Sequence, residues 1–85
     1  MNNKKLLVVF TSYYFGDKAD RILTELSVPH QLIATPPELN DMCGLSIQID
    51  LNTVEQVQTI LKEHKISTSG LFWYEKGKPV LAYKD

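Results

Sequence analysis

The stretch Leu45-Ser46-Ile47-Gln48-Ile49-Asp50 alternates between apolar and polar side chains with a period of two. This alternation is typical of an antiparallel strand that buries one face and leaves the other accessible. Residues 45–50 therefore predict an antiparallel sheet, and the other segments can be placed relative to this strand.

Four further segments have the composition of strands. Residues 5–12 (KLLVVFTS) are apolar and β-branched without alternation, which predicts a central strand paired on both edges and covered by helix on at least one face. Pro36 and Pro37 end the strand that precedes them, because each proline removes a backbone donor. Pro79 suits an edge strand that follows a two-residue turn at Lys76-Gly77. Besides residues 45–50, the expected strands are therefore residues 5–12, 30–34, 71–75 and 78–83.

Two amphipathic stripes predict two helices. In residues 17–26 the apolar side chains recur at i, i+3, i+4 and i+7, and Pro29 prevents the helix from continuing. A second stripe predicts a helix over residues 53–64, and Asn52 followed by Glu55 has the spacing of a capping box at its start. The order strand, helix, strand, strand, helix, strand, plus one terminal strand, predicts an α+β ferredoxin-like sandwich. Right-handed crossovers place strands 5–12 and 45–50 side by side at the centre, antiparallel to each other, with both helices on one face.

Composition indicates one domain over residues 1–85. A chain of 85 residues, 44% of them hydrophobic, can bury one core, and a homodimer would enlarge the buried area. The 9 basic and 10 acidic residues form no run of one sign, which argues against nucleic acid or an anionic membrane as partner. The apolar run 6–10 is too short for a signal peptide or a membrane span, so a cytoplasmic protein is expected.

The turn-rich segment 35–44, TPPELNDMCG, contains Cys43, the only cysteine of the chain. The expected topology brings Cys43 to the same edge of the molecule as residues 11–17 and the end of the second helix. A helix N-terminus or a nearby cation would lower the pKa of the thiol, whereas the neighbouring carboxylates of Glu38 and Asp41 would raise it. The sequence does not decide whether the pKa of the Cys43 thiol is lowered or raised.

Cys43 and Gly44 form the main functional candidate, because a thiol followed by a residue without a side chain leaves room for another molecule to approach the sulfur. The alternative is a cysteine buried as a small apolar residue.

His64 could serve as base or hydrogen-bond partner for Cys43, or could simply close its helix in solvent. His30 is expected about 15 Å or more from Cys43, at ~3.3 Å per strand residue, which argues against a Cys-His dyad. Two histidines and one cysteine, widely spaced, do not suggest a metal site, and no cofactor motif is present.

The sheet offers a second candidate surface. Ser46 and Gln48, with Phe72 and Tyr74 or else Trp73, could form a half-polar face for a partner protein or a twin subunit. Ordinary covering of that face by the C-terminal hairpin is the alternative.

Three segments, Val28-Pro29, Leu32-Ile33-Ala34-Thr35-Pro36 and Cys43-Gly44-Leu45, resemble those of a family of small bacterial proteins described as selenium/sulfur (Se/S) carrier-like. The resemblance covers roughly residues 5–74, which implies a core over these residues and a C-terminal hairpin extension over 75–85. It implies that Cys43 is a carrier thiol, which takes sulfur or selenium from a donor protein as a persulfide or selenosulfide and passes it to an acceptor protein. The chain departs from many relatives at residues 12–15, where they have a Ser-Thr-His-like loop, and at Pro37, where they have arginine.

The resemblance favours a carrier or accessory protein over a stand-alone enzyme. Besides Cys43, the candidate site comprises supporting residues of the adjacent loops and helix ends, namely Ser12, Thr35, Pro36, Gly44 and His64. The alternative function is a non-catalytic interaction or regulatory module in which Cys43 is inert. No convergent set of polar residues supports a metabolite-binding domain.

Overall fold

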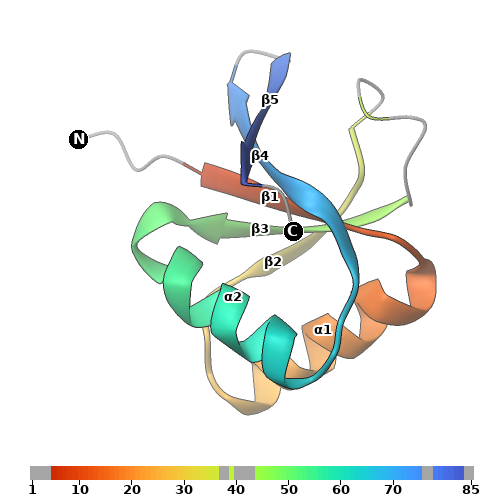
Figure 1. Ribbon diagram of the computed structural model, residues 1–85, viewed down its shortest axis with the longest axis vertical. Coiled ribbons are helices and arrows are strands. Elements are labelled where there is room, and N and C mark those ends of the chain that lie inside the picture. Colours follow the sequence, from red (N-terminus) through yellow and green to blue (C-terminus); the bar gives the residue numbers. More distant parts are fainter. Residues whose placement is uncertain (1–4, 37–38, 40–43, 76–77, 84–85) are drawn as a thin grey trace.

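A computed structural model of the chain describes residues 5–36, 39, 44–75 and 78–83. Five strands form one sheet, and two α-helices lie together on one of its faces (Figure 1). The elements in chain order are β1 (Lys5–Phe10), α1 (Tyr13–Glu25), β2 (Gln31–Ala34), β3 (Leu45–Asp50), the 3-10 turn η2 (Leu51–Thr53), α2 (Val54–Glu63), β4 (Thr68–Glu75) and β5 (Lys78–Tyr83).

The sheet has the order β2-β3-β1-β4-β5, and every neighbouring pair is antiparallel. The strands β1 and β3 are therefore central and antiparallel, as the sequence predicted. The first four strands with their two helices form a ferredoxin-like α+β sandwich, and β5 adds an outer strand beside β4. The expected fold class is confirmed.

The main core lies between the sheet and the helices. Alternate residues of β1 (Leu6, Val8 and Phe10) face the helices and are fully buried. They pack with Ile47 of β3 and Leu23 of α1, which are also fully buried. Each such side chain contributes about 1.5–3 kcal/mol through removal of apolar surface from water, so this layer supplies most of the stability.

A second, smaller core lies on the opposite face of the sheet. Leu7 and Val9 of β1 pack there with Phe72 of β4 and with Leu39, which belongs to the connection between β2 and β3. Ile33 of β2 lies at the margin of this cluster. Because β1 is buried on both faces, its run of apolar residues shows no alternation.

Both helices begin differently from the prediction. Helix α1 begins at Tyr13, a turn earlier than expected, because the hydroxyl of Ser12 accepts a hydrogen bond from the Phe15 N–H at 3.3 Å and caps the helix there. Helix α2 follows the turn η2, and its N-cap residue Thr53 makes no side-chain capping bond. The hydroxyl of Thr53 donates instead to the Asp50 carbonyl at 2.9 Å. The capping box expected at Asn52 was therefore wrong.

The ends of two strands also differ from the prediction. β1 stops at Phe10, where the expected strand ran to residue 12, and β4 begins at Thr68, three residues before the expected start. The register between β1 and β4 shifts between Val9 and Phe10, opposite Gly70, whose φ of 145° favours glycine. This irregularity allows the polar residues before Leu71 to join the sheet. Within the described residues, no helix is both long enough and apolar enough to cross a membrane.

Candidate functional site

The connection between β2 and β3 is held at both of its ends. The Thr35 N–H donates to the Gly44 carbonyl at 2.9 Å, which continues the β2–β3 pairing by one residue. The hydroxyls of Thr35 and Ser46 lie 2.7 Å apart, and this contact satisfies Ser46, which is fully buried. The connection is therefore a closed loop whose two ends meet at the sheet.

Inside this loop, the structure describes Pro36 and Leu39. The Pro36 carbonyl accepts a hydrogen bond from the Leu39 N–H at 2.9 Å, and the Leu39 side chain is 8% exposed, within the second core. Cys43 lies outside the described residues, as do residues 37–38 and 40–42. Gly44, the next residue in the chain, is the described residue adjacent to the candidate thiol.

The first turn of α1 packs against the start of β3. A Cβ atom placed on Gly44 would lie 2.7 Å from the hydroxyl oxygen of Tyr13, and one placed on Gly16 would lie 3.1 Å from the Cβ of Leu45. Both glycines permit this close approach. Tyr13 therefore lies beside Gly44. The expected contact of residues 11–17 with Cys43 involves a residue outside the described part of the chain, so it stays a prediction. The backbone N–H groups of this turn carry the positive end of the helix dipole, which favours an anion such as a thiolate nearby.

The end of β1 and the segment after α2 also meet at this edge. The backbone N–H and the hydroxyl of Thr11 both donate to the Ser67 carbonyl, each at 3.4 Å. These two bonds join the end of β1 to the segment that follows α2.

Each supporting residue of the predicted site has a structural contact. Ser12 caps α1, Thr35 and Gly44 close the loop, and Pro36 accepts the bond from Leu39. His64 is the exposed C-cap residue of α2, where its N–H donates to the Ile60 carbonyl at 3.1 Å.

The side chain of His64 faces a different group of residues. It lines an open hollow with Tyr14 and Ile22 of α1. Thr35, Pro36 and Gly44 thus belong to the described parts of the loop, whereas Ser12 caps α1 and His64 lies beside other residues.

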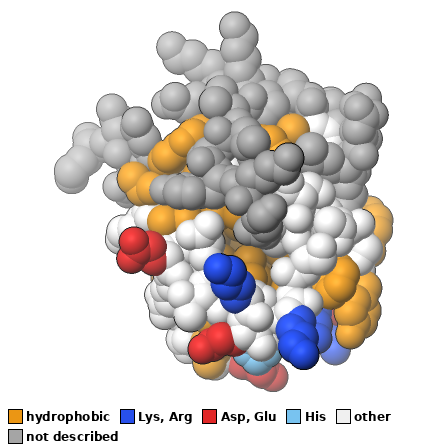
Figure 2. Space-filling view, viewed as in Figure 1, with side chains coloured by type: hydrophobic (Ala, Val, Ile, Leu, Met, Phe, Trp, Pro, Cys, Tyr) orange, Lys and Arg blue, Asp and Glu red, His pale blue; other side chains and the backbone are white. Residues whose placement is uncertain are grey.

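Two exposed tyrosines begin α1, and neither was among the supporting site residues that the sequence suggested; Tyr13 lies beside Gly44. Tyr13 is 65% exposed and Tyr14 is 66% exposed. The ring of Tyr14 makes an edge contact with Phe15, with ring centroids 5.3 Å apart, and the ammonium of Lys18 lies 5.8 Å from its centroid. Hydrophobic side chains reach the surface over the start of α1 in Figure 2, and acidic and basic groups are intermixed over the helices. The sequence signal for these tyrosines is the pair of aromatic residues directly after Ser12.

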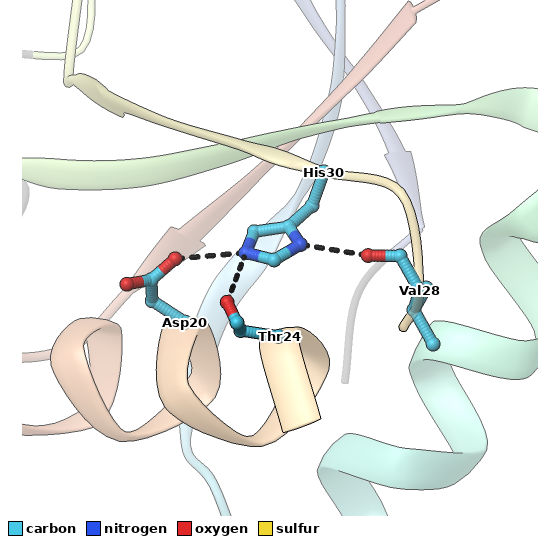
Figure 3. A network of polar contacts seen from close by, with 4 residues as sticks. All are labelled: Asp20, Thr24, Val28 and His30. Atoms are coloured by element: carbon cyan, nitrogen blue, oxygen red, sulfur yellow. Dashed lines mark hydrogen bonds and ion pairs between the residues drawn. The ribbon is translucent and has the colours of Figure 1, made fainter. Parts of the chain in front are cut away.

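His30 belongs to a contact network at the opposite end of β2 (Figure 3). Its Nδ1 donates to the Val28 carbonyl at 2.8 Å, and its Nε2 lies 2.7 Å from Oδ1 of Asp20 and 3.5 Å from the Thr24 hydroxyl. The side chain is 9% exposed. Since Asp20 and Thr24 belong to α1, this network ties the helix to the entry of β2, and its role is structural.

Two residues of the proposed partner surface on the sheet are buried, Gln48 is half-buried, and the side chain of Tyr74 lies outside the description. Ser46 is fully buried and Phe72 is 7% exposed, and Leu39 packs on the same side. Trp73 lies on the other side, against the main core. Within the described part of the chain, no three histidine, cysteine or acidic side chains gather as ligands for a metal ion.

Comparison with known proteins gives one match. The family model described as "Putative Se/S carrier protein-like" matches residues 5–72, which span the sheet from β1 into β4 and include the loop with Cys43. Strand β5 lies beyond the matched residues. No curated protein and no solved structure matches the chain.

Proposed function

The chain belongs to the family described as putative Se/S carrier protein-like, and from this premise we propose that it carries sulfur or selenium on the thiol of Cys43. The matched residues 5–72 contain a single cysteine, which is also the only one in the full sequence. A carrier of either element through a covalent bond to sulfur therefore has one candidate atom, the Sγ of Cys43.

The surroundings of the loop support this role. The bond from Thr35 to Gly44 joins the ends of the loop, and Leu39 anchors its middle in the second core. The first turn of α1 lies beside Gly44, so its backbone donors favour negative charge at this edge of the molecule. The exposed ring of Tyr13 offers a partner protein aromatic surface next to Gly44.

The loading step needs no oxidant. The thiolate of Cys43 attacks the outer sulfur of a donor persulfide, R–S–SH, so that a new S–S bond forms at Cys43 while the donor S–S bond breaks and R–S⁻ leaves. The protein then holds a persulfide, Cys43–S–SH, and the donor is left as a thiol. A donor selenosulfide would transfer selenium by the same exchange and give Cys43–S–SeH.

Release follows from the single cysteine. The chain has no second thiol that could displace the bound sulfur by forming an internal disulfide with Cys43. An acceptor nucleophile must attack the outer sulfur, and the Cys43 thiolate is then the leaving group. Both protein partners therefore have to reach the same atom in turn. A reducing compartment, which keeps the unloaded thiol free, suits this cycle.

The test is loading followed by transfer. Reduced protein is mixed with a small-molecule persulfide, freed of excess reagent, and measured by intact-mass spectrometry. We expect a gain of one sulfur atom in the natural chain and none in Cys43→Ser, which is the matched control. A thiol acceptor added afterwards should take up the sulfur and restore the original protein mass.

Two results would contradict the proposal. Absence of the added sulfur, under conditions that load a known carrier, would leave the alternative function, an interaction module in which Cys43 is inert. Loading without transfer to any thiol acceptor would make Cys43 a reactive cysteine but not a carrier.

A further inference from the structure

Strand β2 forms one edge of the sheet, with β3 as its neighbour on the other side. The bond from the Thr35 N–H to the Gly44 carbonyl fixes which backbone groups point toward β3. The direction of the backbone N–H and C=O groups alternates along an antiparallel strand. The backbone groups of Gln31 and Ile33 therefore also point toward β3. The N–H and C=O groups of Leu32 and Ala34 consequently point outward from the edge.

The two edges of the sheet are built differently. β2 consists of Gln31, Leu32, Ile33 and Ala34, so it carries no charge and no proline, and Leu32 is 40% exposed. The opposite edge strand, β5, begins with Lys78 and Pro79. Charge and proline on an edge strand discourage pairing with another chain, and β2 lacks both.

We propose that β2 pairs antiparallel with β2 of a second copy of this chain, so that two five-stranded sheets continue into one. A two-fold axis at Ile33 sets Leu32 opposite the partner subunit's Ala34, and Ala34 opposite the partner subunit's Leu32. The outward N–H and C=O groups of both residues then form reciprocal hydrogen bonds.

The strand fits its own copy particularly well. On the helix side of the sheet, each Leu32 meets an alanine, and on the opposite side Ile33 meets its counterpart across the axis. Gln31 falls opposite the partner subunit's Thr35, so an amide faces a hydroxyl. No like charges meet within the strand, because β2 has none. Apolar cross-strand pairs of this kind stabilise a sheet.

The dimer is expected to be weak and reversible. Pairing of two four-residue strands buries less than the roughly 1,000 Å² that a stable interface needs. The dimer should therefore form as the protein concentration rises. The inference does not involve Cys43 and stands or falls separately from the proposed function.

Sedimentation velocity from about 1 μM to about 1 mM measures the association, in the presence of a reductant so that no disulfide links two chains. The natural chain should shift from monomer toward dimer. Ala34→Pro removes one outward N–H without touching the β2–β3 bonds, and it should remain monomeric. Ala34→Thr, which keeps the N–H and suits a strand, should dimerise as the natural chain does.

Amide hydrogen exchange tests the geometry without any substitution. Exchange at Leu32 and Ala34 should slow as the concentration rises, whereas Gln31 and Ile33, which bond to β3, should be protected throughout. A monomer at every concentration, or a dimer in which Leu32 and Ala34 exchange as they do in the monomer, would overturn the proposal. Unchanged dimerisation of a folded Ala34→Pro would do the same.

Discussion

Gly44 lies where the first turn of α1 meets the start of β3, and it faces the ring of Tyr13. The sequence suggested that this glycine leaves room for a molecule approaching the sulfur of Cys43. The structure adds a second reason, since a Cβ atom on Gly44 would come within 2.7 Å of the Tyr13 hydroxyl. The crowded atom is the end of a flexible side chain that is 65% exposed, so the ring can turn away at small cost.

Substitution Gly44→Ala separates these two reasons. We expect a loss of less than about 1 kcal/mol in the free energy of unfolding, measured by urea denaturation, because the Tyr13 ring can move into solvent. We also expect slower persulfide loading, because the new methyl group stands next to Cys43. In a Tyr13→Phe background the stability cost should shrink while the loading defect persists. Loading at the natural rate in Gly44→Ala would show that no free space is needed there.

Both α-helices end in the same way, although neither end has a glycine. After α1, the N–H of Val28 donates to the Leu23 carbonyl at 2.9 Å, and after α2 the N–H of Ile66 donates to the Leu61 carbonyl at 2.9 Å. These are Schellman motifs, in which the chain reverses through a residue in the left-handed region. That residue is Ser27 in one case, with φ of 58°, and Lys65 in the other, with φ of 55°. In each motif a buried apolar residue follows, which ties the helix end to the main core.

The substitutions Ser27→Gly and Lys65→Gly should therefore each stabilise the protein. A side chain in the left-handed region costs about 1–2 kcal/mol, and part of this gain is offset by the greater freedom of glycine in the unfolded chain. A net increase of about 0.5–1 kcal/mol in the free energy of unfolding is expected from urea denaturation. Ser27→Ala is the control, because it keeps a Cβ atom at this position and should bring no gain. Equal stability of the Gly and Ala variants would contradict the explanation.

The molecule as a whole has a core on each face of the sheet, and the loop of the candidate site belongs to the smaller one. Leu39 carries this link, because it packs on Leu7, Val9 and Phe72 from the middle of the connection between β2 and β3. The loop is thus coupled to the sheet by apolar packing as well as by the hydrogen bond between Thr35 and Gly44.

Truncation of this side chain should affect both stability and loading. Leu39→Ala is expected to lower the free energy of unfolding by about 2–3 kcal/mol, since it removes buried apolar surface and leaves a cavity. Persulfide loading should change at the same time, because the loop loses its anchor. Leu26→Ala, at a leucine that is 53% exposed, is the matched control and should cost much less. A similar small cost for both variants would mean that Leu39 contributes little to the second core.

The sequence by itself determined the elements, their order and the central position of β1 and β3. These follow from local patterns: alternation in residues 45–50, an unbroken apolar run in β1, and two amphipathic stripes. The Se/S carrier-like resemblance was also visible locally, at residues such as Cys43 and Gly44.

Only the tertiary structure decided the contacts between segments distant in sequence. Ser46 stands at a polar position of the alternating strand, yet it is fully buried, and Thr35, the residue after β2, supplies the partner for its hydroxyl. Leu39 belongs to a second core that no periodic pattern indicated, since the loop that contains it shows no helical or strand periodicity. Periodicity tells which face of an element is apolar, but it carries no information about which residue from elsewhere will cover or satisfy that face. That assignment arises only when pairing and packing bring the segments together.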